Sequence, residues 1–359
     1  MSPDPTSELA RSPQRPPEEG DPAPIVNALD EAERPVSTRD DAIAGRPILL
    51  LFCARPEDPA TLAELAALTA RSDWLAARRA EPFVLTPAPV AANRTWREAR
   101  RLPFRVLSDG GNIFATYGVD AGAESLGPVV FVLDPDHRVA RILAGPGAAT
   151  AAAEAVAGLS PSSAPLRLKA QAPVLVLPRM LAPADCAFLI EVFHHPVRVW
   201  DSDGLNTPGF RNETGDFKVR HDGVYGRLVE YVVQDPELQR FLDSRLQRRL
   251  LPELKKAFQT VVSRREGYRI SCYDASDGGE LAPHRDDSIP RNAHRRFTMT
   301  VNLNAGDYEG GELRFPEYGD QLYDVERGTA IIWSASLLHE VLPIKRGQRF
   351  IVGAHMFGS

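Results

Sequence analysis

Three residues in the C-terminal third of the chain have side chains that bind metal ions. His284 and Asp286 lie one residue apart in the segment PHRD, and His339 follows much later, after the apolar run AIIW. If the first pair lies on a β-strand, side-chain alternation places both residues on the same side. Two imidazoles and one carboxylate on one face of an octahedral ion leave three positions open, an arrangement typical of non-haem Fe(II) centres that use oxygen. The alternative interpretation is a surface pair, His284 and Asp286, with His339 in the core.

Arg349 follows His339 at a spacing that suits a hairpin. The stretch after His339 reads HEVLPIKRGQRF, and the turn at 345–348 can return Arg349 to the cavity that holds His339. A guanidinium group in that cavity can bind a carboxylate through two parallel hydrogen bonds. Lys345 and Arg346 lie in the turn itself, so we expect them in solvent. The glycine pair at 310–311 permits a tight turn or bulge before an apolar strand.

The elements that must position these side chains are short strands. From residue 267 onward the sequence breaks into alternating runs separated by turn residues: YRISCYD, RRFTMTVNLN, GELRFPEY, GTAIIWSA and RFIVGAHMF. This spacing predicts an all-β sandwich or barrel of the jelly-roll kind. Upstream, residues 173–195 indicate a short strand, a loop and a helix, and residues 248–259 indicate a second helix. We expect His221 in a polar loop and His355 in a structural position on the last strand.

The N-terminal half alternates strand and helix patterns instead. The apolar run at 46–53 is typical of a strand buried on both faces. The segments that follow predict a helix at 59–79, a second strand at 81–90 and a basic helix at 93–102 with Asn93 as N-cap. They also predict a hairpin around the sequence DPD at 127–145 and an alanine-rich helix at 147–159. This order predicts an α/β sandwich.

Composition limits the class of protein and the number of domains. The 359 residues are 43% hydrophobic and 25% charged, as in an ordinary globular protein. A net charge of −6 argues against sequence-independent nucleic-acid binding, and three cysteines without a C-x-x-C pair argue against a disulfide framework and fit a cytoplasmic protein. We find no signal-like or membrane-spanning apolar run. Proline-rich and linker-like stretches divide the chain into a disordered tail, a first domain, a linker and a second domain, at 1–24, 25–158, 159–169 and 170–359.

The first domain resembles the peroxiredoxin branch of the thioredoxin fold. The matching stretches are GDPAPIVNALDEAERPVSTRDDAIAGRPILLLF, LSDGGNIFATYGV and VVFVLDPDHRV. In that family a reactive cysteine stands near the start of the first helix, where the helix N-terminus and an arginine stabilise its thiolate. Here that position falls on Thr61, and Cys53 ends an apolar strand, where a thiol is usually a small buried hydrophobe. We therefore expect a degenerate redoxin domain with a binding or scaffolding role.

The second domain resembles the Fe(II)- and 2-oxoglutarate-dependent dioxygenases of the prolyl-4-hydroxylase-like branch. The matching elements are CYDASDGGELAPHRDD, RRFTMTVNLN, YEGGELRFP and RGTAIIWSASLLHEVLPIKRGQRF. The resemblance implies a double-stranded β-helix (jelly roll) with flanking helices, and implies that its iron ligands are His284, Asp286 and His339. By the same resemblance, Arg349 holds the distal carboxylate of 2-oxoglutarate and Tyr273 lines its pocket. Asn302 stands where some members carry a tyrosine that contacts this co-substrate.

The resemblance also implies an activity. The expected reaction is hydroxylation of a C–H bond in a peptide or protein residue or in a small molecule, with Fe(II) as cofactor, 2-oxoglutarate and O₂ as co-substrates, and release of succinate and CO₂; the family also admits ascorbate. Neither a membrane nor a nucleic acid is an expected partner, and the oligomeric state stays open. One alternative is a zinc hydrolase or cupin-type isomerase using the same three ligands, although neither needs a dicarboxylate anchor. The other is a non-catalytic effector-binding protein. The polar segment 194–226 is expected to form a loop over the pocket.

Overall fold

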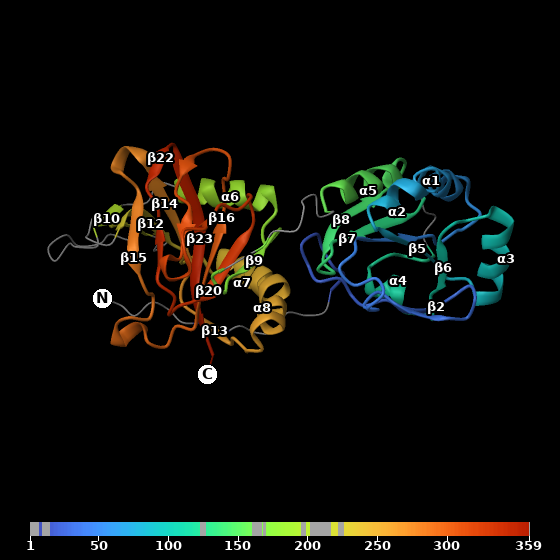
Figure 1. Cartoon of the computed structure of the whole chain (residues 1–359), viewed down its shortest axis with the longest axis horizontal. Coiled ribbons are helices and arrows are strands. Elements are labelled where there is room, and N and C mark those ends of the chain that lie inside the picture. Colours follow the sequence, from blue (N-terminus) through green and yellow to red (C-terminus); the bar gives the residue numbers. More distant parts are fainter. Residues whose placement is uncertain are drawn as a thin grey trace. The chain divides into compact units, whose positions relative to one another are not determined.

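The computed structural model describes residues 7–8, 15–122, 127–159, 167, 170–194, 199–201, 217–221 and 226–358. Contacts between residues divide the chain into two compact units. One lies within residues 13–166, and the other contains residues 167–359 together with strand β1 (Ser7–Glu8) (Figure 1). Among the described residues, every helix is too short or too polar to cross a lipid bilayer.

A mixed β-sheet forms the centre of the N-terminal unit, with strand order β3-β2-β6-β5-β4-β7-β8. Three neighbouring strands are parallel, namely β4 (Ile48–Phe52), β5 (Glu81–Thr86) and β6 (Arg105–Ser108). The edges are antiparallel hairpins, formed by β7 (Val129–Leu133) with β8 (Val139–Ala144) and by β2 (Asn27–Asp30) with β3 (Pro35–Ser37). The helices are α1 (Pro59–Thr69), α2 (Ser72–Ala77), α3 (Val90–Arg100), α4 (Ile113–Thr116) and α5 (Ala148–Ala157).

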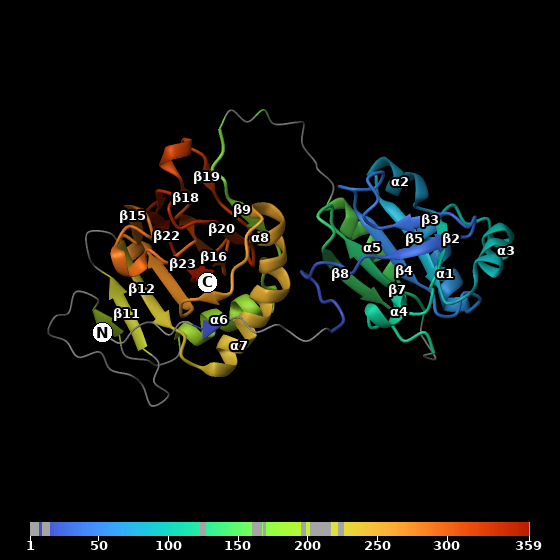
Figure 2. The same ribbon diagram turned by 90° about the horizontal axis from the view of Figure 1, so that it is seen from below.

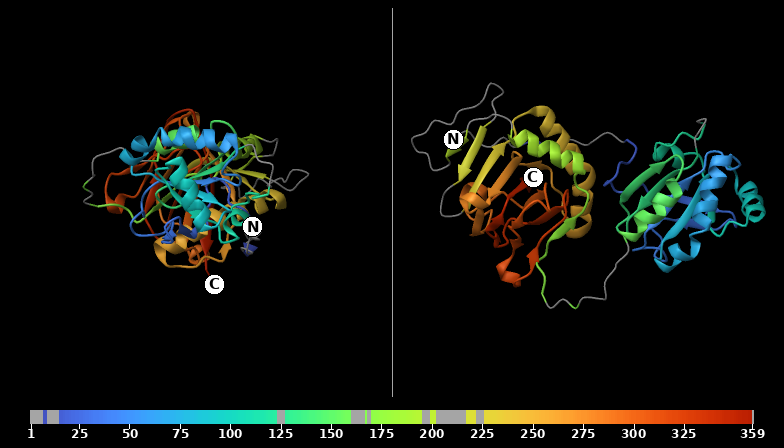
Figure 3. Two further views of the ribbon diagram at one scale, coloured as in Figure 1. Left: turned by 90° about the vertical axis from the view of Figure 1, so that its right-hand side faces the viewer. Right: turned by 90° about the horizontal axis from the view of Figure 1, so that it is seen from above.

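Both faces of this sheet are covered, as the apolar run in β4 predicts. Leu49 and Leu51 belong to a core cluster that includes residues of α1 and α5, whereas Leu50 and Phe52 belong to a second cluster with α4. The ribbon has helices on both faces of this sheet (Figure 3). Every residue of β4 is buried. Strand alternation therefore separates one apolar run into two cores. This arrangement confirms the predicted α/β fold of the thioredoxin type.

Two details of this unit differ from the sequence-based predictions. Helix α3 begins at Val90, so Asn93 is not its N-cap; the buried Asn93 amide instead binds Ser108 and the Ala88 carbonyl. Residues 15–24, which we expected within a disordered tail, pack along β8, where the Gly20 amide donates to the Val139 carbonyl. Apart from residues 7–8, the earlier part of that tail lies outside the described residues, as does most of the expected linker at 159–169.

The start of α1 lacks the features of a reactive thiol. The Asp58 carboxylate caps the helix by accepting hydrogen bonds from the backbone amides of Ala60 and Thr61, so a fixed anion already occupies this helix N-terminus. Cys53 is fully buried, and burial raises the pKa of its thiol to about 12. A thiol with that pKa stays protonated at physiological pH and is a poor nucleophile.

The C-terminal unit is built on a curled sheet that is almost entirely antiparallel. Its main path is β19-β18-β21-β15-β12-β14-β23-β16-β20-β9, and β12 (Gly226–Val232) connects the two halves by pairing with both β14 and β15. The other strands on this path are β9 (Leu175–Leu177), β14 (Arg269–Asp274), β15 (Glu280–His284), β16 (Phe297–Asn302), β18 (Leu313–Arg314), β19 (Leu322–Tyr323), β20 (Ala330–Ser334), β21 (His339–Val341) and β23 (Gln348–Phe357). This topology confirms the predicted jelly-roll fold.

Further strands extend the curled sheet or close its turns. The strand β11 (Phe217–His221) pairs with β12 and with β10 (Val199–Asp201), and β13 (Arg264–Arg265) pairs with one end of β23 and with β1. A separate ladder pairs β17 (Glu309–Gly310) with β22 (Ile344–Arg346). Because β22 leads directly into β23, this small ladder fixes how the chain enters its longest strand.

Helices cover the outer face of the larger half of the sheet. They are α6 (Pro183–His194), α7 (Pro236–Arg245) and α8 (Leu251–Phe258), the last two joined by a π-helical turn at Leu246–Leu250 (Figure 2). Their apolar residues share one core cluster with Phe350, Val352 and Ala354 of β23. The intervening residues of β23 must therefore face the interior of the curled sheet.

The buried thiols lead to a prediction for the intact protein. Cys53, Cys186 and Cys272 are all free and buried, and burial raises the pKa of each to about 12. We expect iodoacetamide at pH 8 to alkylate them at least about a hundredfold more slowly than in urea, because the thiolate fraction is so small. Mass spectrometry of the modified peptides measures this. Rapid labelling of Cys53 in the native protein, or peroxide turnover lost in Cys53→Ser, contradicts the assignment of a redox-inactive domain.

Candidate metal centre

His284, Asp286 and His339 converge in the C-terminal unit. Each offers one ligand atom, and the three atoms lie within 4.8 Å of one another. The Nε2 atoms of His284 and His339 lie 3.5 Å from the two carboxylate oxygens of Asp286. The two histidines are a directly opposed pair on the antiparallel strands β15 and β21, which brings their rings to 4.3 Å between centroids. Cross-strand pairing thus joins residues that are distant in the sequence.

Asp286 reaches the site in a way that strand alternation alone does not provide. Strand β15 ends at His284, so Asp286 lies in the turn that follows. Its backbone amide donates to the Ala335 carbonyl, and its own carbonyl accepts from Arg295. The side chain of Arg285, between the two ligands, points outward and pairs with Glu317. These contacts hold the turn so that Asp286 faces the same space as His284.

Backbone hydrogen bonds set the tautomer of both imidazoles. Nδ1 of His284 lies 2.8 Å from the Ala282 carbonyl, and Nδ1 of His339 lies 3.0 Å from the Leu337 carbonyl. A carbonyl oxygen can only accept, so each Nδ1 carries the proton and each Nε2 presents a lone pair toward Asp286. Such contacts orient metal-binding histidines. Two imidazole nitrogens and a carboxylate oxygen fit a divalent transition metal ion.

The charges of the three groups are set by their burial and by one another. Burial alone would raise the pKa of Asp286, but His284, His355, His339 and Thr298 together hold it well below its usual value. Burial lowers the pKa of His339. For His284 the adjacent Asp286 outweighs burial and raises the pKa. The carboxylate is therefore ionised and His339 neutral at neutral pH, which are the forms that bind metal ions.

A cavity of about 330 Å³ opens beside these three residues. Strand alternation lines it: Arg349, Ile351, Gly353 and His355 of β23 face it, as do Arg269, Ser271 and Tyr273 of β14. Apolar side chains from the smaller half of the sheet complete the wall, among them Leu281, Leu313 and Val341. The cavity therefore combines the cluster of potential metal ligands with a largely apolar interior.

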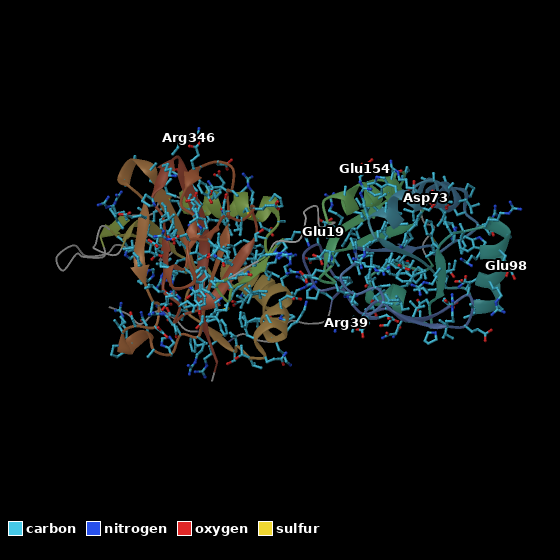
Figure 4. All side chains as sticks on the ribbon, in the orientation of Figure 1. Glu19, Arg39, Asp73, Glu98, Glu154 and Arg346 are labelled. Atoms are coloured by element: carbon cyan, nitrogen blue, oxygen red, sulfur yellow. The ribbon has the colours of Figure 1, made fainter. Side chains whose placement is uncertain are left out.

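Arg349 places a positive charge in this cavity. Arg349 is 6% exposed, and its hydrogen bond within the described part of the chain runs from Nε to the Tyr308 hydroxyl, at 3.3 Å. Among the described residues, no carboxylate forms an ion pair with it. By contrast, Arg346 lies at the outer tip of the preceding turn, where it pairs with the exposed Glu309 (Figure 4). Lys345 is exposed as well. A buried guanidinium without an anionic partner is costly, which favours an anionic ligand in the cavity.

The glycine pair creates the space that this arginine needs. Gly311 has a φ of +73°, and a Cβ there would lie 2.2 Å from Cδ1 of Ile344 and 3.0 Å from Cδ of Arg349. Gly310 has a φ of +83°, and a Cβ there would lie 2.5 Å from the Pro343 carbonyl oxygen. Only glycine accommodates both the left-handed backbone and these contacts. The predicted turn therefore allows β17 to approach the start of β23 closely.

The two residues expected to contact a co-substrate differ in position. Tyr273 lines the cavity, its ring lies 5.6 Å from the Arg349 guanidinium carbon, and its hydroxyl makes no hydrogen bond to a described residue. Asn302 is not among the lining residues; its amide nitrogen donates to the Tyr308 hydroxyl at 2.6 Å and to the Val325 carbonyl. Asn302 therefore reaches Arg349 only through Tyr308. Tyr308 begins the stretch YEGGELRFP, directly before Glu309 and the glycine pair, but no feature of the sequence assigned it a role.

His355 also has a different environment from the structural one we expected. It lines the cavity, and its Nδ1 lies 3.1 Å from the Thr298 hydroxyl, which itself donates to Asp286. Because that hydroxyl has one proton, Nδ1 of His355 must be the donor in the second contact. Burial, with Arg295 and Arg269, lowers the pKa of His355 to about 4 although Asp286 opposes this. Most of the expected loop at 194–226 lies outside the described residues, but His221 lies on β11 and lines the cavity.

Comparison with known proteins places each unit in a family. Residues 268–356 match the model of the 2OG-Fe(II) oxygenase superfamily, and residues 20–142 match that of the AhpC/TSA family. A PKHD-type hydroxylase of Synechococcus sp. (strain JA-2-3B'a(2-13)) is 32% identical over 124 residues, which are 33% of this chain. The chain spans 53% of that relative, about half its length.

Two solved structures are similar to separate parts of the chain. Peroxidoxin BcpB from Mycobacterium tuberculosis covers 40% of this chain and 99% of its own, with a TM-score of 0.37 and 20% identity. The viral collagen prolyl hydroxylase vCPH from Paramecium Bursaria Chlorella virus-1 covers 52% and 96%, with a TM-score of 0.36 and 18% identity. The family matches, each of which lies within one of the two folds described above, support one conclusion. The chain carries a domain of the AhpC/TSA family followed by a domain of the 2OG-Fe(II) oxygenase superfamily.

Proposed function

We propose that this protein is an Fe(II)- and 2-oxoglutarate-dependent dioxygenase that hydroxylates a C–H bond of a peptide residue or a small molecule. Its C-terminal domain supplies the metal ligands His284, Asp286 and His339. Arg349 binds the distal carboxylate of 2-oxoglutarate, and Tyr273 lines the pocket of that co-substrate. The observation that carries the proposal is the buried Arg349 guanidinium, which lies in the same cavity as the three ligands and forms no ion pair with a carboxylate of the described residues.

In this proposal each side chain has a separate task. When bound, Fe(II) with 2-oxoglutarate supplies the oxidising power, and the protein supplies orientation and excludes competing reactions. The Nε2 atoms and the Asp286 carboxylate fix the metal on one face of the cavity. Arg349 fixes the far end of a dicarboxylate with a charge-assisted hydrogen-bond pair, strengthened by the exclusion of water. The apolar residues Leu281, Leu313 and Val341 line the cavity and favour the methylene groups of this co-substrate over water.

Two other functions would each leave part of this site without a role. A metal-dependent hydrolase or isomerase needs the three ligands but gives Arg349 no anion to bind. A non-catalytic sensor needs the anion site but gives no reason for both imidazoles to present free Nε2 atoms beside a carboxylate. For the N-terminal domain we propose a binding or scaffolding role, since Asp58 and the buried Cys53 argue against thiol chemistry.

Anaerobic titration tests the proposed centre directly. Adding Fe(II) and then 2-oxoglutarate should produce a visible charge-transfer band, because the keto acid binds the metal as a chelate. We expect His284→Ala and Asp286→Ala to abolish the band, since each removes one of only three protein ligands. Exposed Glu237→Gln on α7 serves as a folding-neutral control. An unchanged band in Asp286→Ala would exclude this carboxylate as a ligand.

The carboxylate anchor has its own test. Arg349→Ala should raise the 2-oxoglutarate concentration for half-maximal succinate formation by at least about thirtyfold, because a charge-assisted pair in a buried site is lost. Arg346→Ala is the matched control, since this arginine lies in the exposed turn three residues earlier. Equal effects of the two substitutions would contradict the assigned role. Circular dichroism establishes that both variants are folded.

The hydrogen bonds behind Arg349 predict a smaller, graded effect. Tyr308→Phe removes the hydroxyl that accepts from Nε of Arg349, and Asn302→Ala removes the amide that donates to this hydroxyl. We expect each variant to raise the half-maximal 2-oxoglutarate concentration by about three- to tenfold, which corresponds to the loss of roughly 0.6 to 1.4 kcal/mol. The double variant should then lose less than the product of the two effects, since both act through one contact. Strict multiplicativity would mean that the residues act independently.

A further inference from the structure

Part of the cavity wall has no role in the proposed metal and keto-acid sites. It consists of four polar side chains on neighbouring strands: His221 of β11, Glu230 of β12, and Arg269 and Ser271 of β14. They lie on the cavity face because β12 and β14 pair in register, with Glu230 opposite Ser271. We refer to these four residues as the polar wall. A cluster of charged groups inside a largely apolar cavity requires a reason.

Glu230 keeps its negative charge at neutral pH. Nε2 of His221 lies 3.0 Å from one carboxylate oxygen, and the Ser271 hydroxyl donates to the other at 3.1 Å. Burial opposes ionisation, but His221, Arg269 and Ser271 outweigh it and lower the pKa of this carboxyl group to about 2. An ionised carboxylate in such a cavity attracts a cationic group of a ligand, provided that the hydrogen bonds from His221 and Ser271 to the carboxylate are kept.

Arg269 adds a positive charge directly beside it. Its Nε lies 3.7 Å from the Glu230 carboxylate, and the two side chains are 27% and 19% exposed. Neither is sealed from the cavity, since both belong to its lining. The polar wall therefore presents a negative and a positive group next to each other on one surface. A zwitterion with opposite charges a few ångströms apart is complementary to this pattern.

The register places this wall within reach of the metal ligands. Arg269 pairs with Gly353 on β23, two residues before His355, a separation of roughly 7 Å along the strand. The His355 ring in turn lies 3.9 Å from Asp286. A small molecule held at Arg269 and Glu230 can therefore extend its side chain toward the metal centre.

The size of the cavity favours a small ligand. About 330 Å³ is near the lower end for small-molecule sites, and the keto acid occupies part of it. A residue within a peptide has neither a free ammonium nor a free carboxylate group. Binding it against the polar wall would remove water from Glu230 and Arg269 without replacing the lost interactions.

Resting on the proposed function, we infer that the substrate of this site is a free α-amino acid. Its ammonium group binds Glu230, and its carboxylate group binds Arg269. Its side chain carries the C–H bond that is hydroxylated. One oxygen atom of O₂ enters that bond and the other enters succinate, while 2-oxoglutarate loses CO₂ and supplies the two electrons that balance the reaction.

Calorimetry on the full-length protein tests this inference without turnover. The protein is loaded anaerobically with Fe(II) and 2-oxoglutarate and titrated with each of the twenty L-amino acids and with their N-acetyl amides. We expect at least one free amino acid to bind, and its capped form to bind at least about thirtyfold more weakly, because both charged contacts are lost. The same amino acid should stimulate succinate formation in air, and its capped form should not. Equal or tighter binding of the capped form, or of a peptide that contains the residue, overturns the inference.

A variant separates the two charged contacts. Glu230→Gln should weaken binding of the free amino acid by about thirtyfold. The methyl ester of that amino acid, which keeps the ammonium group, should also bind the variant more weakly. The N-acetyl amino acid, which keeps only the carboxylate group, should bind the variant and the unaltered protein equally well. Equal losses for both derivatives count against the assigned contact. Glu237→Gln, an exposed residue of α7, is the matched control.

The outcome also distinguishes this inference from the proposed function. If the charge-transfer band forms but none of the twenty amino acids binds, the substrate assignment fails and the dioxygenase proposal stands. If the band does not form, the dioxygenase proposal fails, and the substrate assignment fails with it. The comparison of free and capped amino acids uses the unaltered protein, so it stays decisive even if Glu230→Gln does not fold.

Discussion

The buried carboxylate of Asp286 is the group around which the C-terminal site is organised. It is 8% exposed and ionised, so the surrounding structure must stabilise a negative charge inside the protein. Among the described residues, the Thr298 hydroxyl donates to this carboxylate and the Nε2 atoms of two histidines lie 3.5 Å from it, whereas no arginine or lysine side chain pairs with it. These partners stabilise the carboxylate only in part, and a divalent cation would complete the balance of charge.

The opposite end of the cavity carries a buried positive charge. Arg349 carries a buried positive charge, and its Nε is held by Tyr308, which is held by Asn302. Asn304 braces the backbone on both sides of this arginine, accepting from the Phe350 amide and donating to the Gln348 carbonyl. Strand β23 connects Arg349 with His355, whose Nδ1 lies 3.9 Å from Asp286; its alternate residues face the cavity while the others form the core with the helices. Packing of the outer face thus fixes the spacing of the two charges.

The N-terminal domain has a thioredoxin-type fold, and Thr61 stands at the position where the family that it resembles carries a reactive cysteine. Its sheet and helices have the thioredoxin arrangement, and its core is divided between the two faces as in any doubly covered sheet. At the start of α1, however, Asp58 satisfies the backbone amides that could otherwise stabilise a thiolate. The Glu64 carboxylate likewise binds the backbone amides of Gly147 and Ala149 at the start of α5. Here the helix termini serve stability.

The sequence by itself determined the features that depend on local pattern. Apolar periodicity defined the two folds, the glycine pair and the turn after His339 predicted the hairpin that returns Arg349, and the residue types at 284, 286 and 339 indicated a metal site. Tertiary structure decided the rest, because those features depend on hydrogen bonds between strands that are distant in the chain. The family resemblance suggested Asn302 as a co-substrate contact, but in the folded structure its amide donates to Tyr308 and Asn302 does not line the cavity. In the same way, His355 and His221 lack any local signal, and it is the curl of the sheet through β12 that brings them to the cavity wall.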